Sequence, residues 1–100
     1  RPVLANNVGG LSGPAVKPIA VRMVYEVAAV VDIPVIGMGG ISSGDDAVEF
    51  MLAGADAVMV GTANFIHPCV CMDVIKGIEA YLLQHNFNHA AQITGKLQLN

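Results

Sequence analysis

The stretch Ile33-Pro34-Val35-Ile36-Gly37-Met38-Gly39-Gly40-Ile41 is a short apolar run that ends in glycines. Its first part, residues 33–36, is too short for a core helix and rich in β-branched residues, so it predicts a strand buried on both faces, as in parallel sheets. Gly39 and Gly40 follow at the carboxyl end of this strand. Because glycine adopts backbone angles closed to other residues and lets a ligand approach main-chain N–H groups, these two positions indicate an anion site.

A second strand of the same kind is predicted at residues 56–60, and it stops at Gly61 and Thr62. The segment between the strands, residues 42–54, predicts a helix. Because a crossover connection keeps two strands parallel, both glycine-containing ends lie on the same side of the sheet. The centre of the chain is therefore predicted to be a strand, helix, strand unit.

Local signals define the ends of this central helix. Ser43 is a suitable N-cap, and Asp45 and Asp46 fall in the first turn, where carboxylates meet the positive end of the helix dipole. An acid and base pair is the alternative role for the two aspartates, but capping explains their placement without chemistry. Gly54 is placed for a left-handed C-cap. The predicted buried stripe of the helix is Val48, Met51 and Leu52.

The other segments are predicted from their periodicity. Residues 9–14 form a glycine-rich loop, which is either a tight turn or a backbone shaped for a ligand. Residues 18–31 form an amphipathic helix, on which Arg22 and Glu26 make an ordinary solvated pair. A further helix follows His67-Pro68, with an apolar face of Val70, Val74, Ile75, Ile78 and Leu82. Residues 84–100 are predicted to be a short terminal helix and a tail, and residues 1–7 either a strand or an arm.

Composition limits the class of protein. The 100 residues are 54% hydrophobic and 13% charged, which excludes disorder. The net charge of −3, without a basic cluster, gives no support for a nucleic-acid surface. No apolar run reaches the ~18 residues of a membrane span, and there is no leader pattern. Because two strands cannot form a parallel sheet buried on both faces, we expect residues 1–100 to be a single partial domain of a larger barrel or sheet.

The cysteines and histidines carry no recognisable site. Cys69 and Cys71 are two apart, a spacing that suits neither a strain-free disulfide nor a zinc site without further ligands. His67 has no nucleophile or carboxylate at a telling spacing, and His85 and His89 lie in a polar segment without a third ligand. We therefore predict neither catalytic residues nor a metal site in this chain.

The two glycine-containing strand ends favour phosphate binding. In a barrel of eight parallel strands the ligand site lies at the carboxyl ends, and a phosphate commonly sits between the last two strands. The N–H groups of Gly39, Gly40, Gly61 and Thr62 can meet its oxygens, although Thr62 can equally cap a helix. The pattern does not identify the phosphate-bearing molecule, so a barrel isomerase or lyase that binds a phosphorylated substrate and a non-catalytic barrel fragment stay open.

Three motifs in order carry a family resemblance. Gly9-Gly10-Leu11-Ser12-Gly13-Pro14-Ala15-Val16-Lys17-Pro18, Ile36-Gly37-Met38-Gly39-Gly40-Ile41 and Val60-Gly61-Thr62-Ala63-Asn64-Phe65 resemble the carboxyl-terminal third of dihydroorotate dehydrogenase catalytic subunits, most closely class 1B. The resemblance extends to about residue 83. It implies an α/β fold, the carboxyl-terminal part of a TIM (β/α)8 barrel that covers about the last two strands and their helices. The residues that it assigns to flavin mononucleotide (FMN), chiefly its phosphate, are Gly13, Gly39, Gly40, Gly61 and Thr62.

The same resemblance implies an activity and partners. The family oxidises dihydroorotate to orotate in pyrimidine biosynthesis, and class 1B works with an electron-transfer subunit that carries FAD and an iron–sulfur cluster. We therefore expect a cytoplasmic enzyme, a homodimer within a heterotetramer. The family's base, a cysteine on a mobile loop, belongs upstream, so neither Cys69 nor Cys71 takes that role and residues 1–100 alone are expected to be inactive. Lys17 lies in a matched motif without an assigned function.

Overall fold

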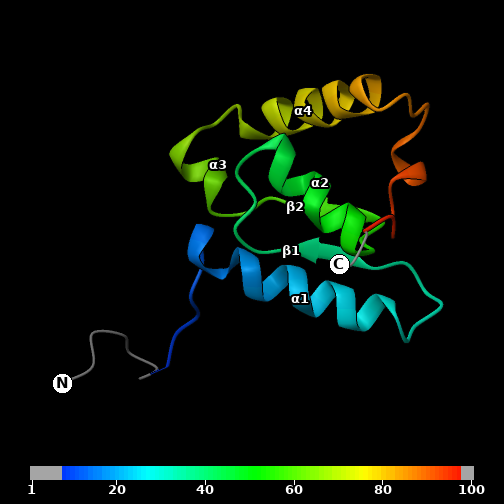
Figure 1. The fold of residues 1–100 in the computed structure, drawn as a ribbon. Helices are drawn as coiled ribbons and strands as arrows, with labels where there is room; N and C mark the ends of the chain where they lie inside the picture. The colour runs from blue at the N-terminus through cyan, green and yellow to red at the C-terminus, as the bar shows by residue number, and fades with distance from the viewer. Residues whose placement is uncertain (1–7, 98–100) are drawn as a thin grey trace.

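The computed structural model describes residues 8–97, and Figure 1 shows the arrangement of their helices and strands. The predicted strand, helix, strand unit is confirmed, whereas the prediction for residues 1–7 lies outside the described part. Within residues 8–97 no helix combines the length and hydropathy that a membrane span requires. In chain order the elements are η1 (Pro14–Val16), α1 (Lys17–Ala28), β1 (Ile36–Met38), α2 (Gly44–Ala53), β2 (Ala57–Met59), α3 (Ala63–Ile66), α4 (Val70–Gln84) and η2 (Ala90–Gln92).

The strands β1 and β2 pair in parallel, with Gly37 opposite Val58. The first strand begins at residue 36, so the prediction of residues 33–36 is wrong in its bounds. Pro34 has no N–H to give to a ladder, and the N–H of Val35 donates to the carboxylate of Asp56 at 2.9 Å. The amide of Asp56 in turn donates to the carbonyl of Val35 at 2.8 Å. Val35 is thus bonded to both the side chain and the backbone of Asp56 before the regular pairing of β1 with β2 begins.

Only one face of this two-stranded sheet is covered within residues 8–97. Gly37 is buried, and a Cβ built on it would lie 2.6 Å from the ring of Phe50 in α2. On the other face Ile36, Met38 and Met59 are 56%, 55% and 52% exposed. The expected burial on both faces is therefore wrong for this chain by itself, because its described helices supply one layer only.

Helix α2 lies between α1 and α4 and contacts both, as Figure 1 shows. The predicted N-cap is confirmed, because Ser43 Oγ accepts a hydrogen bond from the amide of Asp46 at 3.2 Å. Gly54 ends the helix at φ 131°, and its amide donates to the carbonyl of Met51 at 3.0 Å. The fully buried ring of Phe50 anchors the core around α2. Burying a side chain of this size contributes about 1.5–3 kcal/mol to stability.

Helix α1 ends at Ala28, three residues before the predicted end. Val24 is its buried residue and packs into the core cluster, whereas Ile19 and Met23 are exposed. The apolar positions run almost around the helix, so periodicity alone could not select the core face. The predicted pair is confirmed, with Arg22 Nε and Glu26 Oε1 2.9 Å apart.

A glycine pair allows α2 and α4 to cross closely. A Cβ built on Gly44 would lie 2.4 Å from Cα of Gly77, and one built on Gly77 would lie 2.6 Å from Cα of Gly44. Any side chain at either position would therefore overlap with backbone. On α4 Val70 and Val74 are buried as predicted, whereas Ile75 is exposed.

The segment after α4 closes over the carboxyl end of α2. A short 3-10 helix, η2, takes the place of the predicted terminal helix, and Ile93 next to it is fully buried. The amide of Gly95 donates to the carbonyl of Met51 at 2.9 Å, and that of Leu97 to the carbonyl of Leu52 at 3.0 Å. The carbonyl of Leu52 is one that a helix end leaves free, whereas the carbonyl of Met51 also accepts from the amide of Gly54. The segment is therefore part of the fold.

Candidate functional site

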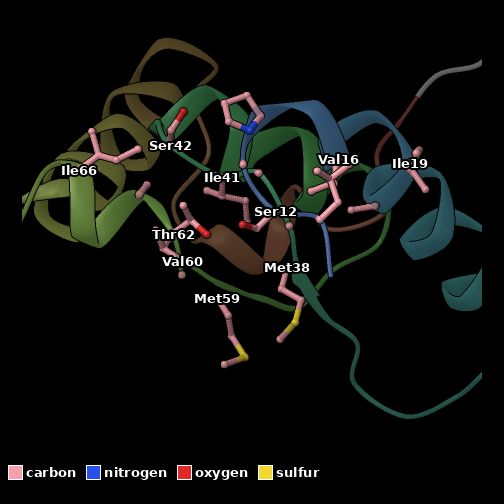
Figure 2. A pocket seen from close by; sticks show the side chains of 18 of the residues that line it. Ser12, Val16, Ile19, Met38, Ile41, Ser42, Met59, Val60, Thr62 and Ile66 are labelled. Carbon is pink, nitrogen blue, oxygen red and sulfur yellow. The ribbon is translucent and has the colours of Figure 1, made fainter. Parts of the chain in front are cut away.

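A pocket of about 490 Å³ lies at the carboxyl ends of β1 and β2 and extends to the start of α1 (Figure 2). All five residues that the sequence assigns to a ligand line this pocket: Gly13, Gly39, Gly40, Gly61 and Thr62. They come from three separate loops, which the fold brings together. Contact between these residues and a ligand stays a prediction.

Most of the remaining pocket wall is apolar. Met38 and Met59 are paired in the sheet register and lie next to each other in Figure 2. Met23 from the exposed face of α1 also lines the pocket, as do the hydroxyl-bearing Ser12 and Ser42. Sequence reasoning did not assign these five residues to a site. For Ser12, Met38 and Ser42, the one feature of the sequence that pointed to a site was their location within or next to the glycine-rich motifs.

The glycines of the first two loops are required by backbone conformation. Gly13, Gly39 and Gly40 have φ values of 91°, 120° and 73°, which side-chain-bearing residues rarely adopt. A Cβ built on Gly40 would lie 2.8 Å from the carbonyl oxygen of Gly13 and 2.9 Å from Cβ of Lys17. The loop at Gly40 therefore lies directly against the first turn of α1.

Gly61 differs from these glycines. Its φ is outside the positive region, and a Cβ built on it would meet no described atom within 4 Å. Neither backbone conformation nor packing among residues 8–97 therefore requires glycine here. Gly61 lines the pocket, so a side chain at this position would occupy space from which a ligand can reach the backbone.

The pocket presents hydrogen-bond donors that the protein does not use. Among residues 8–97, the N–H groups of Gly40, Gly61 and Thr62 donate to no protein acceptor. Thr62 occupies the N-cap position of α3, but its hydroxyl makes no capping hydrogen bond. The capping alternative for Thr62 is therefore wrong, and its hydroxyl stays available. Main-chain N–H groups without a protein acceptor are suited to binding an anion.

The side chain of Asn64 holds the loop after β2. Its Nδ2 donates to the carbonyl of Val60 at 2.6 Å and to that of Gly61 at 3.3 Å. Its Oδ1 accepts from Cys71 Sγ at 3.3 Å, which links the loop to α4. These bonds hold the carbonyls of Val60 and Gly61 and tie the loop to α4.

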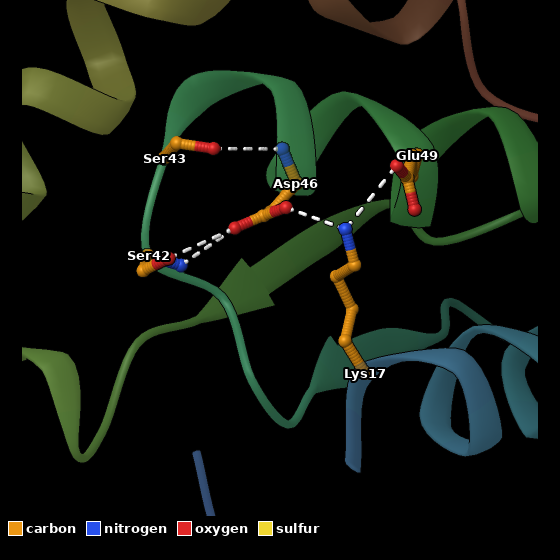
Figure 3. A network of polar contacts seen from close by, with 5 residues as sticks. All are labelled: Lys17, Ser42, Ser43, Asp46 and Glu49. Atoms are coloured by element: carbon orange, nitrogen blue, oxygen red, sulfur yellow. Dashed lines mark hydrogen bonds and ion pairs between the residues drawn. The ribbon is translucent and has the colours of Figure 1, made fainter. Parts of the chain in front are cut away.

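A polar network holds the loop after β1 (Figure 3). Lys17 Nζ lies 2.7 Å from Asp46 Oδ1 and 3.3 Å from Glu49 Oε1. Asp46 Oδ2 accepts from the backbone N of Ser42 at 3.0 Å and from its Oγ at 3.1 Å. One carboxylate therefore connects the start of α1 with the loop that leads into α2.

This network shifts the ionisation of both charged partners. Burial opposes the ionised form of Asp46, but hydrogen bonds from Lys17 and Ser42 outweigh it and lower the pKa of Asp46 below its ordinary value. The hydrogen bond to Asp46 raises the pKa of Lys17, despite partial desolvation. Both groups are therefore charged around neutral pH, and the pair is half-buried, with side chains 24% and 15% exposed.

Comparisons with known proteins identify the family. A family model described as dihydroorotate dehydrogenase matches residues 1–82. The chain belongs to the dihydroorotate dehydrogenase family. It is 60% identical over 97 residues to the catalytic subunit of dihydroorotate dehydrogenase B (NAD(+)) from Alkaliphilus oremlandii, and 55% identical over 96 residues to that from Anoxybacillus flavithermus.

These matches cover 97% and 96% of this chain, but 32% and 31% of the two relatives. The chain thus spans about a third of the length of the curated relatives that it matches. Among solved structures, the crystal structure of DHODH from Eimeria tenella in complex with ferulenol matches with a TM-score of 0.83 and 28% identity. That match covers 96% of this chain and 28% of the other. The expected family and its α/β fold are therefore confirmed.

The cysteines and His67 lie away from the pocket. Cys69 and Cys71 are free and exposed at the start of α4, and neither lines the pocket. His67 pairs with Asp73, with 2.7 Å between Nε2 and Oδ2, on the exposed surface. Within residues 8–97, no three His, Cys, Asp or Glu side chains come together as a metal site requires. Among the described residues, the pocket lining therefore contains neither a cysteine nor a histidine.

Proposed function

We propose that the chain is the carboxyl-terminal part of a (β/α)8 barrel and that β1 and β2 are its last two strands. The parallel pairing of the strands around α2 supports this assignment. The apolar face with Ile36, Met38 and Met59 then belongs to the barrel interior, where side chains from the other strands cover it. The partial coverage of the relatives agrees with this proposal.

In the complete protein, we propose, this segment holds the phosphate of FMN while the enzyme oxidises dihydroorotate to orotate in pyrimidine biosynthesis. The observation that carries the proposal is the meeting of three glycine-rich loops at one pocket with unused main-chain donors. The open space at Gly61 fits a group that presses against the backbone. When bound, the flavin supplies an acceptor for the hydride of the substrate.

Each part of the pocket has a distinct task in this proposal. The N–H groups of Gly40, Gly61 and Thr62, with the Thr62 hydroxyl, donate to phosphate oxygens, as in other backbone anion sites. Met38 and Met59 supply apolar surface that excludes water from the cofactor. The proton-abstracting base and the orotate-binding side chains lie in the preceding part of the enzyme, as the resemblance implies.

The proposal extends to partners. The names of the relatives, which specify a catalytic subunit and NAD(+), support a separate electron-transfer subunit. In keeping with class 1B, we propose that this subunit carries FAD and an iron–sulfur cluster, and that the complete enzyme is a cytoplasmic heterotetramer built on a homodimer of catalytic subunits. Co-purification of the two subunits and light scattering would test this assembly.

Binding of FMN and of riboflavin to the full-length apoprotein tests the proposed function. The two ligands differ by the phosphate, so we expect FMN to bind at least 100-fold more tightly if several charge-assisted hydrogen bonds hold that group. Dihydroorotate should then reduce the bound flavin, seen as bleaching of its visible absorbance. A colourless protein that binds a phosphorylated substrate would favour the isomerase or lyase alternative, and no binding at all would favour a non-catalytic fragment.

A further inference from the structure

We propose that Lys17 and Asp46 are positioning residues for the phosphate pocket. Their ion pair ties the start of α1 to the loop that ends at Ser42, and so fixes the separation of the two walls that carry Gly13 and Gly40. This inference rests on the proposed function, because it assigns the pair to the phosphate of FMN. It concerns residues to which the family resemblance gave no role.

The bonding of Asp46 places it between the two walls (Figure 3). Its Oδ1 lies 2.7 Å from Lys17 Nζ, on the α1 side. Its Oδ2 accepts two hydrogen bonds from Ser42, on the loop side, at 3.0 and 3.1 Å. The amide of Asp46 is held by Ser43 Oγ at 3.2 Å, which fixes the carboxylate relative to α2. Movement of either wall therefore breaks a charge-assisted bond.

Close packing adds a second constraint on the same loop. The Cα of Gly40 faces the first turn of α1 so closely that a Cβ would lie 2.9 Å from Cβ and 3.0 Å from the backbone N of Lys17. The stem of Lys17 thus supports the middle of the loop while its ammonium holds the end through Asp46. Lys17 and Asp46 therefore hold the loop that contributes Gly39, Gly40 and Ser42 to the pocket lining, without lining the pocket themselves.

The charge of Lys17 is directed away from the ligand. Its ammonium contacts two carboxylates, Asp46 and Glu49, and Lys17 does not line the pocket. A lysine in a phosphate-binding loop ordinarily serves as a point charge for the anion. Here the geometry instead assigns it to the framework, and main-chain donors face the phosphate.

Substitution of Lys17 or Asp46 distinguishes a positioning role of Lys17 from direct contact of its ammonium with the phosphate. The test measures the Kd for FMN of the full-length apoprotein, for Lys17→Met, Asp46→Asn and the double variant. A positioning pair predicts that each single variant weakens FMN binding by about tenfold, and that the double variant is no weaker than either single one, because the two residues act as a unit. A lysine that touched phosphate would predict the opposite sign for Asp46→Asn, since the freed ammonium would bind FMN more tightly.

Three further measurements exclude a general effect on folding. Arg22→Met removes another ion pair of α1, one that lies outside the pocket, and should leave the Kd for FMN unchanged. Lys17→Arg should restore most of the affinity that Lys17→Met loses. The Kd for riboflavin should stay within twofold in Lys17→Met and Asp46→Asn, because riboflavin has no phosphate.

Unchanged FMN affinity in both single variants, additive losses in the double variant, or equal losses for riboflavin would each overturn the inference. Failure of the proposed function gives a different result. In that case the wild-type apoprotein itself would not distinguish FMN from riboflavin, and the positioning role would be refuted together with the function.

Discussion

Replacement of Gly61 by alanine should separate ligand binding from folding. Gly61 has no positive φ, and among residues 8–97 nothing lies within 4 Å of a built Cβ. In the absence of flavin the change should therefore stabilise the protein by about 0.4–1 kcal/mol, because alanine restricts the unfolded chain. In the proposed complex, the same methyl group enters the space from which the phosphate approaches the backbone.

The size of the expected loss of FMN affinity follows from the hydrogen bond between the backbone and the phosphate that the methyl group displaces. One charge-assisted hydrogen bond is worth about 1.5–3 kcal/mol, so its loss raises the Kd for FMN by roughly 10- to 150-fold. Fluorescence titration of apoprotein with FMN and thermal unfolding without FMN measure the two effects on one preparation. The expected outcome is weaker binding with an equal or higher Tm.

Gly10→Ala is the matched control for this experiment. Gly10 also has open space at its Cβ and no positive φ, but it does not line the pocket. Its substitution should leave the Kd for FMN unchanged. Unchanged affinity in Gly61→Ala, or a lower Tm together with equal losses of FMN and riboflavin binding, would show that the space at Gly61 serves packing and not phosphate.

Three other changes test the site and its support. Thr62→Val removes only a hydroxyl, so FMN affinity should fall by no more than the single hydrogen bond estimated above, and equal affinity in a titration would show that the hydroxyl points elsewhere. Gly77→Ala places a methyl group against the backbone of Gly44 and should cost about 1–3 kcal/mol in urea unfolding, a loss absent if the helices shift freely. Because the pKa of Asp46 is lowered, its ionised form stabilises the folded protein above its unfolded pKa, and this stabilisation is lost as pH falls through its folded pKa. Because the pKa of Lys17 is raised, the stabilisation by its charged form is lost only at alkaline pH. The stability difference between wild type and Asp46→Asn should therefore be constant around neutral pH and shrink below about pH 4, and a constant difference down to pH 2 would contradict the pairing.

Local signals predicted the part of the fold that depends on neighbours in sequence. The cap at Ser43 and the C-terminal glycine at Gly54 act within one helical turn, so the bounds of α2 followed from the sequence. The glycine-containing strand ends at Gly39 and Gly61 likewise gave the location of the pocket, because a parallel strand pair brings both ends to one edge.

The features that the sequence could not reveal depend on distant neighbours. Lys17 and Asp46 are 29 residues apart, so no pattern could show their pairing. The buried face of α1 was ambiguous because apolar residues nearly surround that helix, and contact with the core selects Val24. The late start of β1 follows from Pro34 and from Asp56, a residue of the following strand segment.

The segment after α4, which closes over the carboxyl end of α2, gives a reference for amide deuterium exchange. Exchange in this segment reports opening of the fold, whereas exchange at the pocket loops reports motion of the pocket. The amides of Gly95 and Leu97 are bonded to the last turn of α2, so deuterium enters them when that turn opens. The amides of Gly40 and Gly61 lack protein acceptors among residues 8–97 and should exchange fast until an anion covers them. A ligand that slows exchange at Gly40 and Gly61 but leaves the segment after α4 unchanged is thus located by the labelling pattern alone.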